Sequence, residues 1–161
     1  MKKIIYSLLL VVALGACTPK SANKVETVQL AASVSIFPKG KAIEGTNFNG
    51  TAYLQRLMTD SETFDVVVSD VVFEPQARNG WHSHPGGQIL IATAGKGYYQ
   101  EKGKTIQVLN PGDVVAIPAD VVHWHGAAPD SGFTHIAINT KVHLGATQWY
   151  EPVTDEEYNN K

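Results

Sequence analysis

Short apolar runs separated by turn residues fill the chain from about position 51 onward. The runs are rich in Val, Ile and Tyr and are bounded by Gly, Pro, Asn and Asp, a pattern that is typical of β-strands. Strands are predicted over residues 51–57, 64–73, 88–93, 97–101, 105–109, 114–117, 121–124 and 133–139. Many short strands at regular spacing favour an all-β fold, either an antiparallel sandwich or a small barrel.

Two of the links between these runs have the composition of tight turns. Lys102-Gly103-Lys104 suits a hairpin, and the segment 110–113 contains the Pro-Gly pair of a proline-initiated turn. A helix is predicted only near the end, where Thr154 precedes three acidic residues that suit a helix N-terminus. The sequence contains no internal repeat and no sign of a second domain.

The first residues have the pattern of an export signal. Lys2 and Lys3 precede an apolar stretch from Ile4 to Leu14, which is followed by small residues and Cys17. The apolar stretch is shorter than the roughly 20 residues of a membrane span, and a short anchor helix is the alternative interpretation. Around Cys17 the segment resembles the lipobox of bacterial lipoproteins. The resemblance implies that Cys17 becomes a lipidated first residue, with plain secretion as the alternative.

We therefore expect a signal peptide over residues 1–16, a tether and N-terminal extension over 17–44, and the folded domain over 45–161. The polar segment after Cys17 has no sustained period, as expected of a tether. Cys17 is the only cysteine, so its lipidation would leave no thiol for a disulfide or a metal. The expected location is the cell envelope, with the protein lipid-anchored as a periplasmic or outer-membrane lipoprotein.

Composition and charge indicate which classes of binding partner are expected. The chain has 13 Lys and Arg against 15 Asp and Glu, and 43% hydrophobic residues, which describes an ordinary globular protein. There is no basic surplus to neutralise phosphates, so nucleic acid is not expected as a partner and a small molecule is favoured. Removal of Lys2 and Lys3 makes the balance more acidic, so only the lipid is expected to hold the protein at a membrane.

All six histidines lie between positions 82 and 143. His82 and His84 are two residues apart, as are His123 and His125, so each pair projects to one face of an extended strand. His135 lies on a third predicted strand. An isolated histidine is usually structural, but two such pairs on predicted strands favour a site for a divalent cation such as Mn, Fe, Zn, Ni or Co.

The spacing around these pairs resembles the two sequence motifs of the cupin family. The first motif is matched by His82, His84, Gln88 and Gly95, and the second by Gly112, Pro118 and His123. The chain departs from the motifs at Gln76, Gln88, Asp120 and Ala127, which replace Gly, Glu, Gly and Asn. The resemblance covers about residues 45 to 150 and implies an all-β cupin fold, the double-stranded β-helix or jelly-roll barrel.

The match is closer to one branch of small single-domain cupins, which includes the manganese-dependent hydroxynitrile lyases. Residues 80–85, 87–88, 123–129 and 134–135 carry this likeness. In that branch Gln is the habitual fourth ligand. The resemblance implies one divalent transition metal, Mn before Fe, Zn, Ni or Co, bound by His82, His84, Gln88 and His123. Four protein ligands on a metal that accepts six leave positions for substrate or water.

His125 and His135 remain as unligated bases in the same predicted cavity. We expect a small substrate whose hydroxyl or carbonyl oxygen meets the metal while His135, assisted by His125, transfers its proton. A purely hydrogen-bonding role for His125 is the alternative. Trp81 and Trp124 are either part of the pocket wall or simple core residues. His143 is assigned to the surface.

The predicted function is a lyase-type reaction that breaks or forms a carbon–carbon bond at a hydroxylated carbon, as the hydroxynitrile lyase resemblance implies. A metal-dependent dioxygenase or isomerase is an alternative within enzymes. A non-catalytic envelope lipoprotein that binds a small molecule is the alternative outside enzymes. By analogy with other cupins, which pair through strands at the barrel edge, a homodimer is expected.

Overall fold

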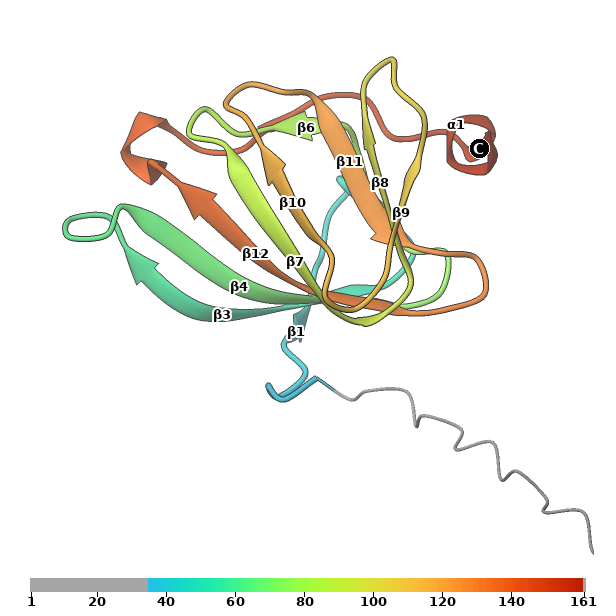
Figure 1. The fold of residues 1–161 in the computed structure, drawn as a ribbon, viewed down its shortest axis with the longest axis horizontal. Coiled ribbons are helices and arrows are strands. Elements are labelled where there is room, and N and C mark those ends of the chain that lie inside the picture. The colour runs from blue at the N-terminus through green and yellow to red at the C-terminus, as the bar shows by residue number, and fades with distance from the viewer. Residues whose placement is uncertain (1–34, 161) are drawn as a thin grey trace, which may run out of the picture.

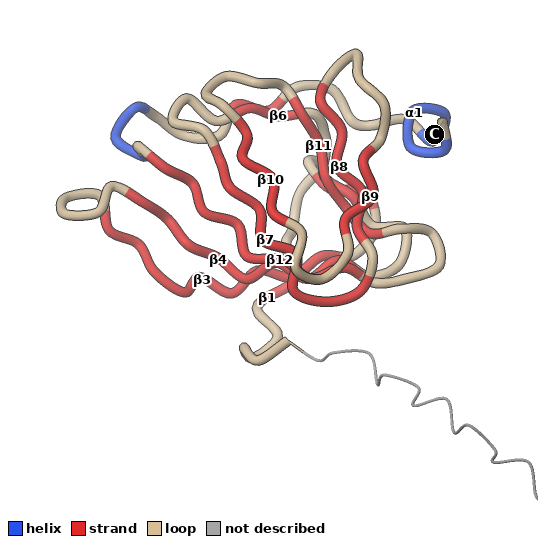
Figure 2. Tube along the Cα trace, in the orientation of Figure 1, coloured by secondary structure: helices blue, strands red, loops and turns tan. Residues whose placement is uncertain are grey.

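The computed structural model describes residues 35–160. Nearly all of the regular structure is β, in two antiparallel sheets that curl toward each other (Figure 1). Two short helical segments complete the fold: the 3-10 turn η1 (Val142–Leu144) and the helix α1 (Asp155–Asn159), both coloured blue in Figure 2.

The first sheet has six strands and the second has seven. The order of the first is β1 (Lys41–Ala42), β3 (Ala52–Asp60), β4 (Val66–Phe73), β12 (Phe133–Thr140), β7 (Gln88–Gly95) and β10 (Val114–Ile117). The path of the second is β13 (Gln148–Trp149), β6 (His82–Ser83), β11 (His123–Ala127), β5 (Arg78–Asn79) and β2 (Phe48–Asn49). Strand β8 (Gly97–Glu101) also pairs with β11, and β9 (Gln107–Leu109) pairs with β8.

Strand alternation places a regular array of side chains on the inner face of the first sheet. Because successive residues of a strand point to opposite faces, cross-strand partners of equal parity form rows. One row is Leu54, Val71, His135 and Ala92; the next is Arg56, Ser69, Ala137 and Leu90; the third includes Val67, Asn139 and Gln88. Polar and titratable side chains therefore share this face with the apolar core.

The buried apolar side chains form two clusters. The first lies between the sheets and includes Phe73, Leu90 and Phe133. The second brings together the buried side chains of Trp81, Tyr98, Trp124, Ala128, Val153 and Tyr158, and so covers the outer side of the second sheet with the C-terminal segment. Trp81 and Trp124 are thus core residues, the second of the two roles considered for them.

The C-terminal helix is fixed to the barrel by polar contacts as well as by packing. Thr154 and Glu157 form a reciprocal capping box at its start, as the Thr154 signal predicted. The Tyr158 hydroxyl donates to the Ala127 carbonyl at 2.8 Å, and the buried Arg78 side chain donates to the Val153 carbonyl and to Asp155. The helix therefore contacts strands β5 and β11, which carry site residues.

All eight predicted strands are present, with boundaries that shift by up to a few residues. Both predicted turns are found: Gly103 lies between β8 and β9, and Asp113 donates its N–H to the Asn110 carbonyl. Strand β11 begins at His123 instead of residue 121, because Asp120 adopts a left-handed conformation (φ 62°) that ends the preceding turn. The two-residue strands β1, β2, β5 and β13 were not predicted, since two residues carry no alternation, whereas β6 lies where the His82 and His84 pair predicted an extended strand.

The ordered sheet begins earlier than the predicted domain start at residue 45. Lys41 and Ala42 form β1 and pair with Leu54 and Tyr53 of β3, so the end of the predicted extension 17–44 belongs to the barrel. No helix within residues 35–160 is long and apolar enough to cross a membrane. The predicted signal segment and Cys17 lie outside the described residues.

The core residue Leu90 provides a test of the inner face of the first sheet. Its side chain is 0% exposed in the first cluster. We expect Leu90→Ala to lower the free energy of unfolding by about 3 kcal/mol, from lost burial and the cavity left behind. Val108→Ala, on the exposed side of β9, is the matched control and should change it by less than about 0.5 kcal/mol. Urea denaturation measures both, and equal effects would contradict this packing.

Candidate metal centre

Five imidazoles converge inside the barrel. His82 and His84 come from β6 and the residue after it, His123 and His125 from β11, and His135 from β12. The ring centroids of His82 and His123 are 4.2 Å apart, and those of His82 and His84 are 5.1 Å apart. All five side chains are buried. The predicted convergence of the two His-x-His pairs is therefore observed, and the sixth histidine, His143, lies at the surface as expected.

Two of these imidazoles have their proton position fixed by the backbone. The Nδ1 atom of His82 lies 3.0 Å from the Gly80 carbonyl oxygen, and that of His123 lies 2.8 Å from the Val121 carbonyl oxygen. A carbonyl oxygen only accepts hydrogen bonds, so Nδ1 carries the proton in both rings. The lone pair then resides on Nε2. Backbone partners of this kind orient histidines that bind metals.

Gln88 presents its amide oxygen to the same point. Its Nε2 donates to Asn139 Oδ1 at 2.9 Å, which turns Oε1 toward His123, and Oε1 lies 3.2 Å from His123 Nε2. With Nδ1 of His123 protonated, both of these atoms are acceptors, so their contact is no hydrogen bond. A cation is the partner that would satisfy both lone pairs.

His84 adds a further nitrogen of the same kind. Its Nδ1 lies 3.2 Å from the Thr147 hydroxyl, whereas its Nε2 is buried and has no hydrogen-bond partner among the described residues. Buried polar atoms are rarely left without a partner, because each costs about 1–3 kcal/mol. The four predicted ligands, His82, His84, Gln88 and His123, thus fit a divalent cation.

His125 lies next to this group but in a different environment. The Asn79 side-chain amide is 3.1 Å from Nε2 and 3.3 Å from Nδ1 of His125, and Asn79 Oδ1 accepts from the His125 backbone N–H at 2.9 Å. The amide N–H therefore occupies a lone pair of this imidazole. His82, His123 and His125 form a compact triad, with nitrogens within 4.8 Å of one another, that could also hold an ion. The two possible ligand sets share His82 and His123.

His135 lies behind His125, away from the cavity. Its ring stacks between Phe73 and Phe133, with centroids 5.8 and 5.0 Å away, and meets His125 edge-on at 4.8 Å. Neither ring nitrogen has a hydrogen-bond partner within the described part of the chain. Strand alternation correctly placed His135 on the inner face, but it did not show that His125 would stand between it and the cavity.

Burial keeps these histidines uncharged. Desolvation lowers the pKa of His84 and of His123 to about 4 and that of His135 to about 3. It holds the pKa of His82 and of His125 well below the usual range, with further lowering from neighbouring histidines. Neutral imidazole is the form that binds metals, so the site is ready for a cation at neutral pH.

A cavity of about 170 Å³ opens onto the histidines. Its wall combines polar groups, among them His82, His84, Gln88 and His125, with apolar side chains. The apolar part is formed by Ile43, Phe48, Leu54, Val67, Val71, Ala137 and Trp149. Trp149 therefore supplies the aromatic wall for which Trp81 and Trp124 were candidates. A second hollow of about 390 Å³ shares His84, Asn139 and Thr147 with this cavity.

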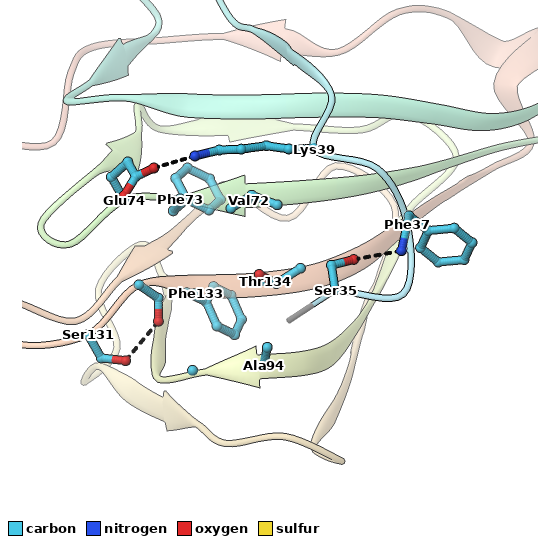
Figure 3. A pocket seen from close by; sticks show the side chains of 12 residues that line it. Ser35, Phe37, Lys39, Val72, Phe73, Glu74, Ala94, Ser131, Phe133 and Thr134 are labelled. Carbon is cyan, nitrogen blue, oxygen red and sulfur yellow. Dashed lines mark hydrogen bonds and ion pairs between the residues drawn. The ribbon is translucent and has the colours of Figure 1, made fainter. Parts of the chain in front are cut away.

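Another hollow, of about 350 Å³, involves the N-terminal segment of the described chain (Figure 3). Ser35, Phe37 and Lys39 form one side, and Lys39 Nζ lies 2.6 Å from a Glu74 carboxylate oxygen. None of the described histidines lines it. It is therefore separate from the candidate metal centre.

Three polar side chains that orient the histidine cluster were not predicted. Asn139 shares a strand face with His135, so alternation placed it inside the barrel without giving it a role. Asn79 precedes the first motif, and Thr147 follows the last long strand, where neither spacing nor alternation carries a signal.

Comparison with known proteins agrees with this architecture. Residues 69–138 match the model of the cupin domain. The (R)-mandelonitrile lyase of Granulicella tundricola is 44% identical over 111 residues, which are 69% of this chain and 85% of that protein. A cupin-like protein of Thermotoga maritima is 54% identical, with a TM-score of 0.75 over 78% of this chain and 95% of its own. The chain belongs to the cupin family, and the predicted jelly-roll fold is confirmed.

A more distant structure shares only the fold. The DMSP lyase DddQ of Ruegeria pomeroyi is 19% identical, with a TM-score of 0.56, covering 65% of this chain and 54% of that one. The family and the histidine cluster together define a cupin with a possible metal site.

Metal content distinguishes the two possible ligand sets. We expect about one divalent metal per chain in the purified protein and in His125→Ala, and loss of the metal in His84→Ala. The physical reason is that His84 has a free buried Nε2, whereas the His125 lone pair is occupied by Asn79. Elemental analysis after dialysis measures this, with the surface variant His143→Ala as the control. Metal loss in His125→Ala with retention in His84→Ala would select the compact triad instead.

The lowered pKa values predict that the metal-free protein loses stability as the pH falls. The folded-state pKa of each buried histidine lies below the unfolded value near 6.5, so the unfolded chain binds more protons. The contribution of the neutral histidines to the free energy of unfolding is therefore complete above pH 6.5. It declines as the pH falls from 6.5 to about 4. We expect a decline steeper than about 1.4 kcal/mol per pH unit, because several histidines contribute.

Urea denaturation with EDTA at pH 7, 6 and 5 measures this slope. The exposed variant His143→Gln should show the same slope as the parent. A stability that stays flat from pH 7 to 5 would show that the buried imidazoles are protonated in the folded state.

Proposed function

We propose that this cupin is a divalent-metal-dependent lyase that breaks or forms a carbon–carbon bond at a hydroxylated carbon of a small substrate. The observation that carries the proposal is the pair of buried, neutral imidazoles of His125 and His135 beside four neutral ligand groups, at a partly apolar cavity. The similarity to a (R)-mandelonitrile lyase supports cyanohydrins as the first substrates to test.

The metal is proposed to be bound by His82, His84, Gln88 and His123. When bound, it would act as a Lewis acid toward the substrate oxygen, the more strongly because all four ligand groups are uncharged. Manganese is the proposed ion. The apolar wall of the cavity, with Phe48 and Trp149, suits the hydrocarbon part of a substrate and excludes water from it.

The proton transfers are assigned to the two remaining histidines. His125 lines the cavity and is the group that meets the substrate, while Asn79 fixes its orientation. In cyanohydrin cleavage the hydroxyl proton passes to an imidazole, the bond between the carbinol carbon and the nitrile carbon breaks, and cyanide leaves and takes up a proton. His135, packed against His125, is proposed to assist it, which reverses the order of roles expected from the sequence.

Two further features of the sequence analysis remain proposals. Lipidation of Cys17 would anchor the protein in the cell envelope. A homodimer would cover the edge strands β1 and β10 of the first sheet. Mass spectrometry of the membrane fraction tests the lipid, and light scattering of the soluble domain tests the dimer.

Substitution of His125 and His135 tests their proposed roles in proton transfer. We expect His125→Ala to lower cleavage of mandelonitrile by about 10²–10⁴-fold, the usual contribution of a proton-transfer group, without loss of bound metal. His135→Ala should lower it by a smaller factor, since that ring acts through His125. The measurement is release of benzaldehyde by the manganese-loaded protein, with His143→Ala as the control. Unchanged turnover in both variants would refute these assignments.

A further inference from the structure

Arg56 stands where the histidine cavity and the neighbouring hollow meet. It lies on β3 and lines both spaces, as do Val67 and Asn139. It is the only Lys or Arg among the described residues that line either space, and no Asp or Glu lines them. The mouth of the candidate site therefore carries a permanent positive charge with no acidic neighbour in its wall.

The Arg56 guanidinium has no ion-pair partner within residues 35–160. Five other basic side chains of the barrel are paired with carboxylates, namely Lys39, Arg78, Lys96, Lys102 and Lys104. Lys41 and Lys141 are described without an ion pair as well, but neither lines the cavity or the neighbouring hollow. An arginine presents up to five N–H donors in a planar fork, a geometry that matches a carboxylate. Arg56 is exposed and lines both spaces, so its donors are available to a ligand there.

The sheet register explains how a ligand could reach Arg56 and the histidines at once. Arg56 pairs with Ser69, which pairs with Ala137, so two small side chains lie between Arg56 and Leu90 on the inner face. The strand of Arg56 and that of Gln88 are three strand spacings apart, roughly 14 Å along the sheet. Because Arg56 and His84 line the same cavity and the same neighbouring hollow, one ligand in these spaces could contact both.

The proposed metal site at the other end is also positive when a divalent cation is bound, because its proposed ligands are all uncharged. We propose that Arg56 binds a carboxylate of the substrate, so that the preferred substrates are small hydroxy or oxo compounds that carry a carboxylate several atoms from the reacting carbon. This inference rests on the proposed function for the reacting end. It distinguishes the preferred substrates from mandelonitrile, the test substrate above, which carries no anion.

A matched pair of ligands tests the inference without relying on turnover. The probes are 4-formylbenzoate and the neutral 4-formylbenzamide, which have similar shape, and their binding is measured by calorimetry on manganese-loaded and on EDTA-treated protein. We expect the loaded parent to bind the carboxylate about tenfold more tightly than the amide, since charge-assisted bonds are the stronger ones. Raising the salt from about 0.05 to about 0.5 M should reduce this preference, because the site is partly exposed.

Three variants identify the residue responsible. Arg56→Gln should abolish the carboxylate preference, and Arg56→Lys should retain part of it. Lys96→Gln removes the same charge from a side chain that lines neither space, so it should leave the preference intact. An equal loss in Lys96→Gln would indicate only a long-range field, and a preference that survives Arg56→Gln would place the carboxylate elsewhere; either result overturns the proposal.

The proposed lyase function can fail separately. If 4-formylbenzoate binds in an Arg56-dependent way but no cyanohydrin is cleaved, the lyase reaction is wrong and the anion site stands. If mandelonitrile is cleaved and the parent shows no carboxylate preference, the lyase function stands and the role of Arg56 is wrong.

Discussion

The interior of this barrel depends on keeping five buried imidazoles neutral. Removal from water makes protonation unfavourable, so each buried histidine has a lone pair that needs a partner. The backbone carbonyls of Gly80 and Val121 accept the Nδ1 protons of two rings and so direct their lone pairs inward. The strands that converge here leave several acceptors facing one another, an arrangement that a bound cation would stabilise.

The amides around the cluster divide the histidines into two kinds. Asn139 acts on the cluster indirectly, by holding the Gln88 amide so that its oxygen joins the inward lone pairs. Asn79 has the opposite effect on His125, because its side-chain N–H donates a hydrogen bond to a ring nitrogen and so uses the lone pair that a metal would need. His123 and His125 lie on the same five-residue strand, β11, but differ in their hydrogen-bond partners. The partner of His123 leaves its Nε2 lone pair free for a metal, whereas Asn79 engages His125, which we propose for proton transfer.

The sequence predicted the inner face well wherever strands are long. Alternation placed His135 and Asn139 inside the barrel, and the two His-x-His pairs were correctly expected to converge. It could not order His125 and His135 by depth, because depth depends on how Phe73 and Phe133 pack around the second ring. Short strands such as β5 and β13 gave no signal, so Asn79 and Trp149 were missed. Nothing in the sequence marked Arg56, because its position depends on how the cavity and the neighbouring hollow meet.

Strand β5 consists of two residues with different attachments. Arg78 holds the C-terminal segment through Val153 and Asp155, and the next residue, Asn79, holds His125. The C-terminal helix is thereby connected to His125 through two residues that are adjacent in the chain. For anyone preparing the protein, this makes the C-terminus a poor place for a purification tag or a truncation, because a change there acts on Arg78, the chain neighbour of the residue that holds His125.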